Sequence, residues 1–267
     1  MKKILIIGKK SFLGSNLTIY LSKHYNVDNY SFKKVLKKKS NFFSQYSYII
    51  NTTIHPNYVK KKYQPLFDLD KKFINKFNHR ALKLNFIYIF LSSRKIYKQK
   101  ECINEKSLIQ PVCNYSRNKR NTEVFLKKKL KKNLLILRIS NILGKRIFFK
   151  SRKAHKLFLD NYIDYRKNKR KIIVKDDFKD FLSIEQFSII IKKIIKFNLN
   201  GVYNVSLGKK IYISEILSWL DKKFLKRVEF KSGTNKDSFT LSNEKLIKKL
   251  KIRITKNQLK NFCKKLI

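Results

Sequence analysis

KILIIGKKSFLG, residues Lys3 to Gly14, is the stretch of sequence that decides the fold. Its apolar half, Ile4–Ile7, has the length and composition of a buried parallel strand. Gly8 then indicates a tight turn. Apolar residues recur at helical spacing after the turn, up to His24; they are Phe12, Leu13, Leu17, Tyr20 and Leu21. The opening therefore predicts a strand, a turn and a helix.

Glycines in the turn between that strand and that helix predict a dinucleotide-binding site. They let the backbone turn tightly and approach a pyrophosphate, which lies at the helix N-terminus because free N–H groups and the dipole favour anions there. Ser11 stands in place of the middle glycine; its side chain narrows the approach, although its hydroxyl can donate to a phosphate. The candidate cofactor contacts are Gly8, Lys10, Ser11, Phe12, Leu13 and Gly14. A purely structural turn is the alternative.

Strands and helices alternate through the first half of the chain. Strands are expected within residues 25–32 and at Ser47–Asn51, Asn85–Leu91 and Asn133–Arg138, and helices at Phe67–Leu84 and Tyr115–Lys132, after a polar loop at Lys98–Asn114. This alternation builds a parallel sheet covered on both faces, with ligands at the carboxyl ends of the strands. The predicted fold class is α/β, a Rossmann-like doubly wound parallel sheet with a small C-terminal substrate lobe.

The pattern loosens beyond Gly144. We expect helices at Ala154–Arg166, Ile184–Phe197, Glu215–Phe224 (capped by Ser214) and over most of Asn243–Ile267, and strands at Lys171–Val174 and Gly201–Val205. Residues 1–145 are assigned to an NAD(P)-binding Rossmann domain, to which residues 176–206 return. Residues 146–175 and 207–267 are assigned to the substrate-binding lobe.

The chain is strongly basic, with 65 Lys and Arg against 17 Asp and Glu among 267 residues and a formal net charge of +48 at pH 7. Lysines that neutralise phosphates and rings that stack on bases would fit nucleic-acid binding. The lysines, however, are spread almost evenly and greatly outnumber arginines, whereas a functional patch should be clustered. We therefore interpret the charge as a composition bias and expect no specific nucleic-acid partner. A positive surface still attracts any anionic substrate.

The apolar fraction of 43% is enough for a substantial core and excludes a disordered basic tail. The longest unbroken apolar runs, Ile4–Ile7 and Phe86–Leu91, are far shorter than the roughly 20 residues that span a bilayer. The first is also too short for a secretory signal, so a cytoplasmic protein is expected. Cys102, Cys113 and Cys263 are odd in number and form no CxxC pair, which predicts neither a disulfide framework nor a metal site.

A second motif, at Tyr115 to Lys119 (YSRNK), has residue types suited to acid/base chemistry. Its Tyr and Lys lie four residues apart on one helical face, so the ammonium can favour the phenolate and the phenol can exchange a proton with a substrate oxygen. The spacing alone is weak evidence in a chain this rich in lysine. The position is more informative, because the pair opens the helix after the fourth strand, which ends in Ser92 and Ser93.

Taken together, these segments resemble the extended short-chain dehydrogenases/reductases, in the NAD-dependent epimerase/dehydratase branch that acts on nucleotide-activated sugars. The matching segments are Gly8–Gly14, Tyr48–Thr53, Leu91–Tyr97, Pro111–Glu123, Leu137–Gly144, Lys179–Leu182 and Gly201–Val205. Their joint order and spacing are far more specific than any single motif. The resemblance implies NAD or NADP as the cofactor and a nucleotide sugar as the substrate.

The resemblance also implies roles for individual residues. Ser93, four residues before Tyr97, occupies the position of the catalytic Ser or Thr, Tyr115 that of the acid/base, and Lys119 that of its electrostatic partner, which also binds the nicotinamide ribose. Tyr115 would remove a sugar hydroxyl proton during hydride transfer to the nicotinamide, or donate a proton when a ketone is reduced. Ser93 would hydrogen-bond the same oxygen.

The sequence departs from the family pattern in ways that bear on the reaction. Arg94 and Lys95 follow Ser93 where the sugar 4,6-dehydratases carry an Asp-Glu pair for water elimination, so dehydration is disfavoured. Epimerisation and 4-keto reduction remain. Asp70 stands where the family often has Asn at the start of a helix.

Other contacts are less sharply defined. Thr52, after the third strand, is a candidate cofactor contact, and Ser93, Asn141 and Asp180 are candidates for the substrate side. Asp28 could take the adenine ribose hydroxyls and favour NAD, whereas Lys10, Lys33 and Lys34 could meet a 2′-phosphate and favour NADP. Both cofactors remain open.

Two rival functions accompany this interpretation. The first is a non-catalytic NAD(P)-binding member of the same fold, and the second is a nucleic-acid-binding protein. The oligomeric state is also left open and is compatible with a homodimer.

Overall fold

A computed structural model of the protein describes residues 2–77, 85–148, 157–167, 171–234 and 237–266. Its centre is a six-stranded sheet in the order β10-β5-β4-β3-β1-β2, with every neighbouring pair parallel. The strands are β1 (Lys3–Ile7), β2 (Asn26–Tyr30), β3 (Tyr48–Asn51), β4 (Ile87–Ser93), β5 (Leu134–Ile139) and β10 (Gly201–Val205). The predicted Rossmann-like α/β fold is confirmed.

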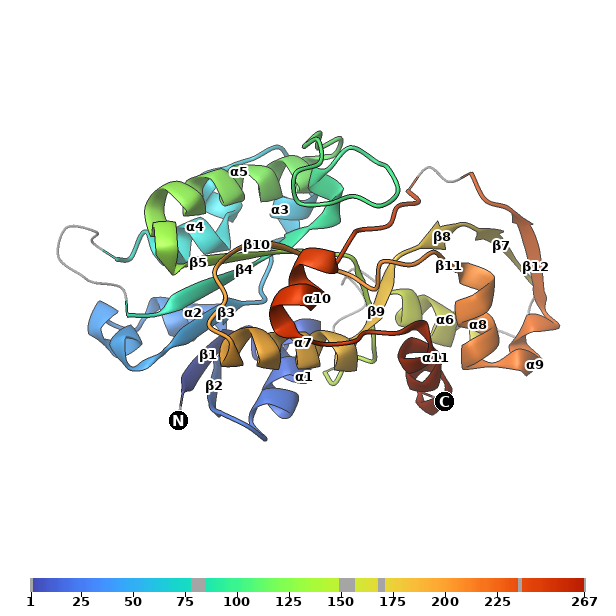
Figure 1. Ribbon diagram of the computed structural model, residues 1–267, viewed down its shortest axis with the longest axis horizontal. Helices are drawn as coiled ribbons and strands as arrows, with labels where there is room; N and C mark the ends of the chain where they lie inside the picture. The colour runs from blue at the N-terminus through green and yellow to red at the C-terminus, as the bar shows by residue number, and fades with distance from the viewer. Residues whose placement is uncertain (1, 78–84, 149–156, 168–170, 235–236, 267) are drawn as a thin grey trace.

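Both faces of the sheet are buried, which is why its strands are almost continuously apolar rather than alternating. In β1, Ile4 and Ile6 belong to the core on one face, whereas Leu5 and Ile7 belong to the core on the other. Helices α1 (Phe12–Leu21) and α7 (Ile184–Lys196) cover the first face. The second is covered by α2 (Phe32–Leu36), α3 (Pro56–Lys60), α4 (Leu69–Ile74) and α5 (Asn114–Leu130) (Figure 1).

The order in which strands are added to the sheet reverses at β1, and this reversal determines where a ligand can bind. The chain leaves β1 through α1 to reach β2 on one side, then crosses to β3 on the other side. The carboxyl ends of β1 and β3 therefore open a crevice between their following segments, as at the switch point of other doubly wound sheets. Gly8 follows β1 there, and Thr52 follows β3.

A smaller lobe packs beside the carboxyl end of the sheet (Figure 1). It contains three two-stranded pairs: β6 (Asn141–Leu143) with β9 (Phe181–Ser183), β7 (Ile172–Asp176) with β12 (Val228–Ser232), and β8 (Phe178–Lys179) with β11 (Ile211–Tyr212). Its helices are α6 (Phe158–Lys167), α8 (Ile213–Leu220), α9 (Lys222–Leu225) and α11 (Lys256–Lys265). Helix α10 (Glu244–Leu250) contacts β10 and α7 instead, so this part of the predicted lobe lies against the sheet domain.

Several element boundaries differ from the prediction. The helix expected at Phe67–Leu84 is only α4, Leu69–Ile74, within the described chain, and residues 78–84 lie outside it. Residues 154–156 of another expected helix also lie outside the described residues. Ser214 is not a cap, because α8 begins one residue before it. The helix expected to continue to Phe224 stops at Leu220, and Asp221 caps the separate short helix α9.

Over the part of the chain that the structure describes, we find no helix with the length and hydrophobicity needed to cross a membrane.

Candidate active site

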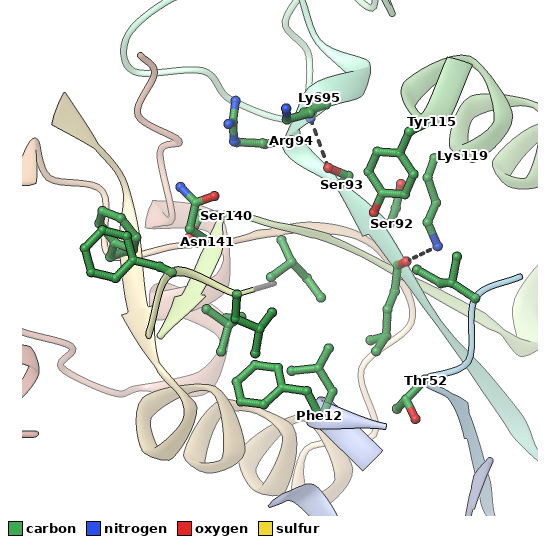
Figure 2. A pocket seen from close by; sticks show the side chains of 18 of the residues that line it. Phe12, Thr52, Ser92, Ser93, Arg94, Lys95, Tyr115, Lys119, Ser140 and Asn141 are labelled. Atoms are coloured by element: carbon green, nitrogen blue, oxygen red, sulfur yellow. Dashed lines mark hydrogen bonds between the residues drawn. The ribbon is translucent and has the colours of Figure 1, made fainter. Parts of the chain in front are cut away.

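A cavity of about 480 Å³ lies between the carboxyl end of the sheet and the lobe (Figure 2). Segments from many separate parts of the chain line it. The sheet domain contributes Phe12 and Leu13 from the start of α1, Thr52 after β3, Ser92 and Ser93 at the end of β4, and Tyr115 and Lys119 from α5. The opposite side is lined by Ser140 and Asn141 after β5, by Lys179 at the end of β8 and by Asp237, among others. Residues predicted to contact the cofactor and residues predicted to contact the substrate thus line the same cavity.

The turn between β1 and α1 is held by two hydroxyls. Thr52 Oγ1 donates to the carbonyl oxygen of Ile7 at 2.8 Å and lies 2.6 Å from Ser11 Oγ. Because the single Thr52 proton is used in the first contact, Ser11 donates in the second. Ser11 Oγ also accepts a hydrogen bond from the N–H of Gly14 at 2.9 Å and so caps α1. The Ser11 side chain is therefore turned into the loop rather than toward the cavity.

The two predicted glycines are needed for close packing in this turn. Gly8 has a φ of +128°, a backbone conformation that side chains rarely adopt. A Cβ on Gly14 would lie 2.6 Å from both Ser11 Oγ and Thr52 Oγ1 and would clash with the carbonyl oxygen of Gly8. This leaves the first residues of α1, Phe12 and Leu13, at the cavity wall with the helix N-terminus behind them.

The three predicted catalytic residues line the same end of the cavity (Figure 2). Ser93 ends β4, and its Oγ accepts a hydrogen bond from the N–H of Lys95 at 3.2 Å. Tyr115 is in the first turn of α5, and Lys119 is one turn further on. The Lys119 Nζ lies 6.0 Å from the centre of the Tyr115 ring. A phenol, an ammonium and an alcohol from two elements are thereby brought together.

Lys119 is almost fully buried, and its surroundings explain how a charge is tolerated there. Its Nζ donates to the carbonyl oxygen of Leu91 at 2.8 Å and lies 4.6 Å from the centre of the Phe90 ring. Buried Asp70, on α4, supplies a carboxylate close enough to interact with it. Burial raises the pKa of Asp70 to about 6, although the Lys119 charge acts to lower it. The ammonium is thus fixed in position with a partner charge behind it.

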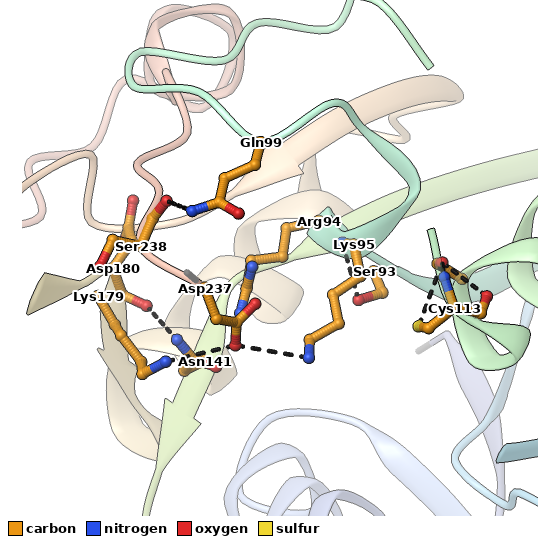
Figure 3. A network of polar contacts seen from close by, with 11 residues as sticks. Ser93, Arg94, Lys95, Gln99, Cys113, Asn141, Lys179, Asp180, Asp237 and Ser238 are labelled. Atoms are coloured by element: carbon orange, nitrogen blue, oxygen red, sulfur yellow. Dashed lines mark hydrogen bonds and ion pairs between the residues drawn. The ribbon is translucent and has the colours of Figure 1, made fainter. Parts of the chain in front are cut away.

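Three cationic side chains surround a single carboxylate in the wall of the cavity, next to Ser93 (Figure 3). Asp237 Oδ2 lies 2.9 Å from Arg94 Nη2, 3.3 Å from Lys179 Nζ and 3.5 Å from Lys95 Nζ. Burial opposes the charge of Asp237, but the three cations more than offset it and lower its pKa. Arg94 is 7% exposed and lies over the Phe239 ring, 3.1 Å from its centre.

Two polar residues from the lobe side complete the wall. Asn141 lines the cavity and donates from Nδ2 to the carbonyl oxygen of Asp180 at 3.1 Å. The buried Oγ of Ser140 has no hydrogen-bond partner among the described residues, although it belongs to a residue that lines the cavity. An unpaired buried hydroxyl is costly unless a bound molecule satisfies it, which makes Ser140 a candidate contact for a ligand.

Comparison with known proteins identifies the fold. No family model matches the sequence, and no curated protein matches it. Solved structures, however, match over the whole chain. UDP-N-acetylglucosamine 4-epimerase from Methanobrevibacter ruminantium, in complex with UDP-N-acetylmuramic acid, is 18% identical with a TM-score of 0.76, covering 99% of this chain and 96% of that one. dTDP-4-dehydrorhamnose reductase from Clostridium acetobutylicum is 17% identical with a TM-score of 0.76, covering 99% and 98%.

A third structure, dTDP-glucose 4,6-dehydratase from Bacillus anthracis in complex with NAD, is 14% identical with a TM-score of 0.75, covering 100% of this chain and 95% of that one. The chain has the fold of the nucleotide-sugar epimerases, dehydratases and reductases. The resemblance found in the sequence is thereby confirmed for the fold of the whole chain. At these identities the extended short-chain dehydrogenase/reductase fold does not specify which reaction the protein performs.

Six residues predicted for the site are not among those that line the cavity: Gly8, Lys10, Ser11, Gly14, Asp28 and Asp180. Asp28 lies in the middle of β2, two residues before its end, and its Oδ2 is 2.6 Å from the Tyr46 hydroxyl and 3.3 Å from Lys3 Nζ. The carboxyl end of the strand is instead at Tyr30. Lys10 is exposed on the turn and also lies outside the cavity lining.

Asp180 is a structural residue rather than a wall of the cavity. It is fully buried, and its carboxylate accepts hydrogen bonds from the backbone N–H groups of Leu207, Gly208 and Leu241 at 2.9 to 3.1 Å. Burial raises its pKa to about 7, and the three N–H donors act in the opposite direction. Its carboxylate ties the β8–β9 junction to two later segments of the chain, and its side chain does not line the cavity.

A buried network of hydrogen bonds and ion pairs behind Ser93 was not predicted from the sequence. Ser92 Oγ donates to Glu123 Oε1 at 2.6 Å, and Arg138 contacts both oxygens of Glu123 at 2.8 and 3.1 Å. Arg138 Nη1 also donates to the Tyr97 hydroxyl at 2.7 Å. This network connects α5 to β4 and β5 and so fixes the helix that carries Tyr115. Ser92 could have indicated this network, because neighbouring residues of a strand point to opposite faces and Ser92 therefore points away from Ser93.

Proposed function

We propose that the protein is an NAD(P)-dependent oxidoreductase or epimerase that acts on a nucleotide-activated sugar. The observation that supports this most strongly is the presence of Ser93, Tyr115 and Lys119 in one cavity that also reaches the start of α1. Hydride transfer with an acid/base phenol needs this set of groups beside a dinucleotide site. The residues come from separate segments, so their meeting is more informative than the spacing of Tyr115 and Lys119 in the sequence.

Each of the three residues has a distinct task in the proposed reaction. A bound nicotinamide would supply the acceptor or donor of hydride. Tyr115 accepts the proton of a sugar hydroxyl as phenolate, or returns one to a ketone as phenol. Ser93 hydrogen-bonds the same oxygen and steadies its developing charge. Lys119, held by Leu91 and Phe90, stabilises the negative charge that develops on the Tyr115 oxygen during the proton transfer and binds the nicotinamide ribose.

The turn from Gly8 to Gly14 is proposed to hold the pyrophosphate of the cofactor. The fit is supported by the closeness of the two glycines to Thr52 and by Phe12 and Leu13 at the cavity wall, beside a helix N-terminus. Ser11 does not block this approach, because its hydroxyl is used within the turn. With Asp28 engaged by Tyr46 and Lys3, we propose no contact from it to the ribose, and both NAD and NADP stay open.

Ser93, Ser140 and Asn141 are proposed to contact the sugar. Epimerisation or ketone reduction is favoured over dehydration, because Arg94 and Lys95 stand after Ser93 where dehydratases carry acids. The carboxylate in that part of the cavity, Asp237, is held in ion pairs with Arg94 and Lys95 and is poorly suited to accept a proton.

The test is to incubate the purified protein with oxidised or reduced NAD and NADP and a panel of UDP- and dTDP-sugars, analysing products by chromatography and mass spectrometry. We expect conversion of at least one sugar by the wild type and none by Tyr115→Phe. Cofactor binding without conversion of any sugar would favour the non-catalytic rival instead. Nucleic-acid binding that survives physiological salt with a steep salt dependence would favour the other rival.

A further inference from the structure

The cationic cluster of Arg94, Lys95 and Lys179 is not explained by the hydride-transfer chemistry. All three side chains line the cavity, as does Asp237, the carboxylate that they share. Three positive charges against one negative charge leave an excess of +2 at this place. Asp180 also interacts with Arg94 through space, but even if it is counted as fully ionised the positive groups remain in the majority.

Two of the three cations are partly withdrawn from water. Arg94 is 7% exposed and the side chain of Lys179 is 23% exposed, whereas the side chain of Lys95 is 41% exposed. Positive charges that are partly withdrawn from water are stabilised by an anion, and their attraction for it is stronger than that of solvated lysines. The cluster therefore differs from the many lysines that are spread over the surface of this basic chain.

Asp237 indicates which anion fits. A single carboxylate oxygen, Oδ2, makes ion pairs with all three cations at 2.9 to 3.5 Å. The geometry of the cluster is thus already suited to a carboxylate (Figure 3). The Asp237 side chain is also 45% exposed, so the shared carboxylate remains accessible to solvent.

The position of the cluster decides between the two anionic parts that a nucleotide sugar can carry. Arg94 and Lys95 directly follow Ser93, and the Lys95 N–H donates to Ser93 Oγ. For 4-keto reduction, or for epimerisation at the same carbon, the oxygen that Ser93 hydrogen-bonds is the one on C4 of the sugar. The diphosphate is attached at C1, across the ring from C4, whereas the group on C5 is next to it. A cluster joined to Ser93 in sequence and in space is therefore better placed for an acidic group on C5 than for the diphosphate.

We propose that Arg94, Lys95 and Lys179 bind a carboxylate carried by the sugar ring, so that the substrate is a nucleotide-activated uronic acid. This inference rests on the proposed function and names the substrate class for that site. Asp237 holds the three cations in place and is joined, or displaced from one of them, by the carboxylate of the substrate.

The test compares ligands that differ only in this carboxylate. Binding of UDP, UDP-glucose and UDP-glucuronate is measured by titration calorimetry with the full-length protein saturated with NAD⁺ or NADP⁺, whichever it binds. We expect UDP-glucuronate to bind at least about tenfold more tightly than UDP-glucose, as charge-assisted hydrogen bonds to a carboxylate would give.

The variant that tests the cluster is Lys95→Gln with Lys179→Gln, because the buried Arg94 cannot be replaced without disturbing its packing on Phe239. This pair should bring the affinities for the two sugars to within about twofold of each other, since it removes two of the three cations. The matched control is Lys100→Gln with Lys106→Gln, which removes two exposed charges outside the cavity and should keep the preference.

Two results would overturn the inference. If the wild type binds UDP-glucose and UDP-glucuronate equally tightly, the cluster does not bind the carboxylate of the sugar. If the cluster variant loses as much affinity for UDP, which carries no sugar, as it loses for UDP-glucuronate, the cations bind the diphosphate instead. Failure of the proposed function gives a different result, the absence of binding by all three ligands, and it removes this inference as well.

Discussion

Lys119 Nζ lies 6.0 Å from the centre of the Tyr115 ring while donating a 2.8 Å hydrogen bond to the carbonyl oxygen of Leu91. The two residues are one helical turn apart on α5, so the helix sets their separation. The contact with Leu91 joins the ammonium to β4, the strand that ends in Ser93. The helix and the strand thus fix the proposed acid/base pair together.

Replacing Tyr115 by Phe should abolish turnover and leave cofactor binding nearly intact. Only the hydroxyl that exchanges the proton is lost, and positioned acid/base groups contribute roughly 10²–10⁴-fold to rates. The measurements are the rate with the sugar that the panel identifies and a fluorescence titration with the cofactor. Tyr165→Phe, a change of an exposed tyrosine, is the control and should keep the rate. An undiminished rate in Tyr115→Phe would remove this residue from the chemistry.

Replacing Lys119 by Ala should damage both cofactor affinity and rate. Its ammonium is proposed to bind the nicotinamide ribose and to stabilise the charge that develops on the Tyr115 oxygen, so both readouts depend on it. The variant should also lose about 1–3 kcal/mol in the free energy of unfolding, because the charge-assisted hydrogen bond to Leu91 is lost and Asp70 keeps no partner charge from this residue. Lys128→Ala, on the exposed face of α5, is the control. Wild-type values for both affinity and rate would refute the role of Lys119.

Replacing Gly14 by Ala should destabilise the turn that is proposed to hold the pyrophosphate. The new methyl group would meet Ser11 Oγ and Thr52 Oγ1 at 2.6 Å, and overpacking of this kind costs roughly 1–3 kcal/mol. Denaturant unfolding should report the lost stability, and a titration should report weaker cofactor binding. Lys10→Ala, exposed in the same turn, should stay within about 0.5 kcal/mol of the wild type. A fully stable Gly14→Ala that binds the cofactor normally would contradict the packing described here.

Replacing Asp28 by Asn should lower stability without changing cofactor affinity. The carboxylate accepts from the Tyr46 hydroxyl and pairs with Lys3, so about 1 kcal/mol of the free energy of unfolding depends on it. Calorimetric titrations with NAD⁺ and NADP⁺ provide the second readout. A selective loss of NAD⁺ affinity would mean that Asp28 reaches the adenine ribose after all.

Asp180 should make the stability of the protein depend on pH. Its pKa in the folded state is about 7, above the ordinary value of 3.8, so between these values the folded protein holds a proton that the unfolded chain has lost. This contribution to the free energy of unfolding therefore decreases as the pH rises, by at most about 1.4 kcal/mol per pH unit, and levels off above the folded pKa.

Asp180→Asn removes this titration while keeping a carbonyl oxygen that can accept from the backbone. The quantity to measure is the difference in unfolding free energy between the wild type and this variant, followed by denaturant unfolding across the acidic and neutral range. The advantage of the wild type should shrink as the pH rises and then stay constant. If this difference in unfolding free energy does not change with pH, the pKa of the buried Asp180 carboxyl is not raised.

The sequence predicted the fold well because the deciding signals are local. A short apolar run before Gly8, and helical spacing after it, require only neighbouring residues to be read. The same is true of Ser93 at the end of a strand and of Tyr115 and Lys119 on one helical face. These three residues line the same cavity because the carboxyl ends of parallel strands meet at one edge of the sheet.

The parts that the sequence missed depend on contacts between distant segments. Asp237 has its three cations at positions far from it in the chain, so no spacing pattern connects them. Asp28 lies in the expected strand, but only the structure gives the tyrosine and lysine that engage it. Asp180 lies in a segment shared with the family, yet burial and three backbone donors make it structural.

A crystal structure of the protein with NAD⁺ or NADP⁺ and UDP bound is the most direct test of the account. It is expected to have the pyrophosphate at the start of α1 and the nicotinamide ring facing the Tyr115 hydroxyl, with the ribose within hydrogen-bonding reach of Lys119. A cofactor bound away from these three groups, or crystals that take up UDP but no dinucleotide at saturating concentration, would contradict it.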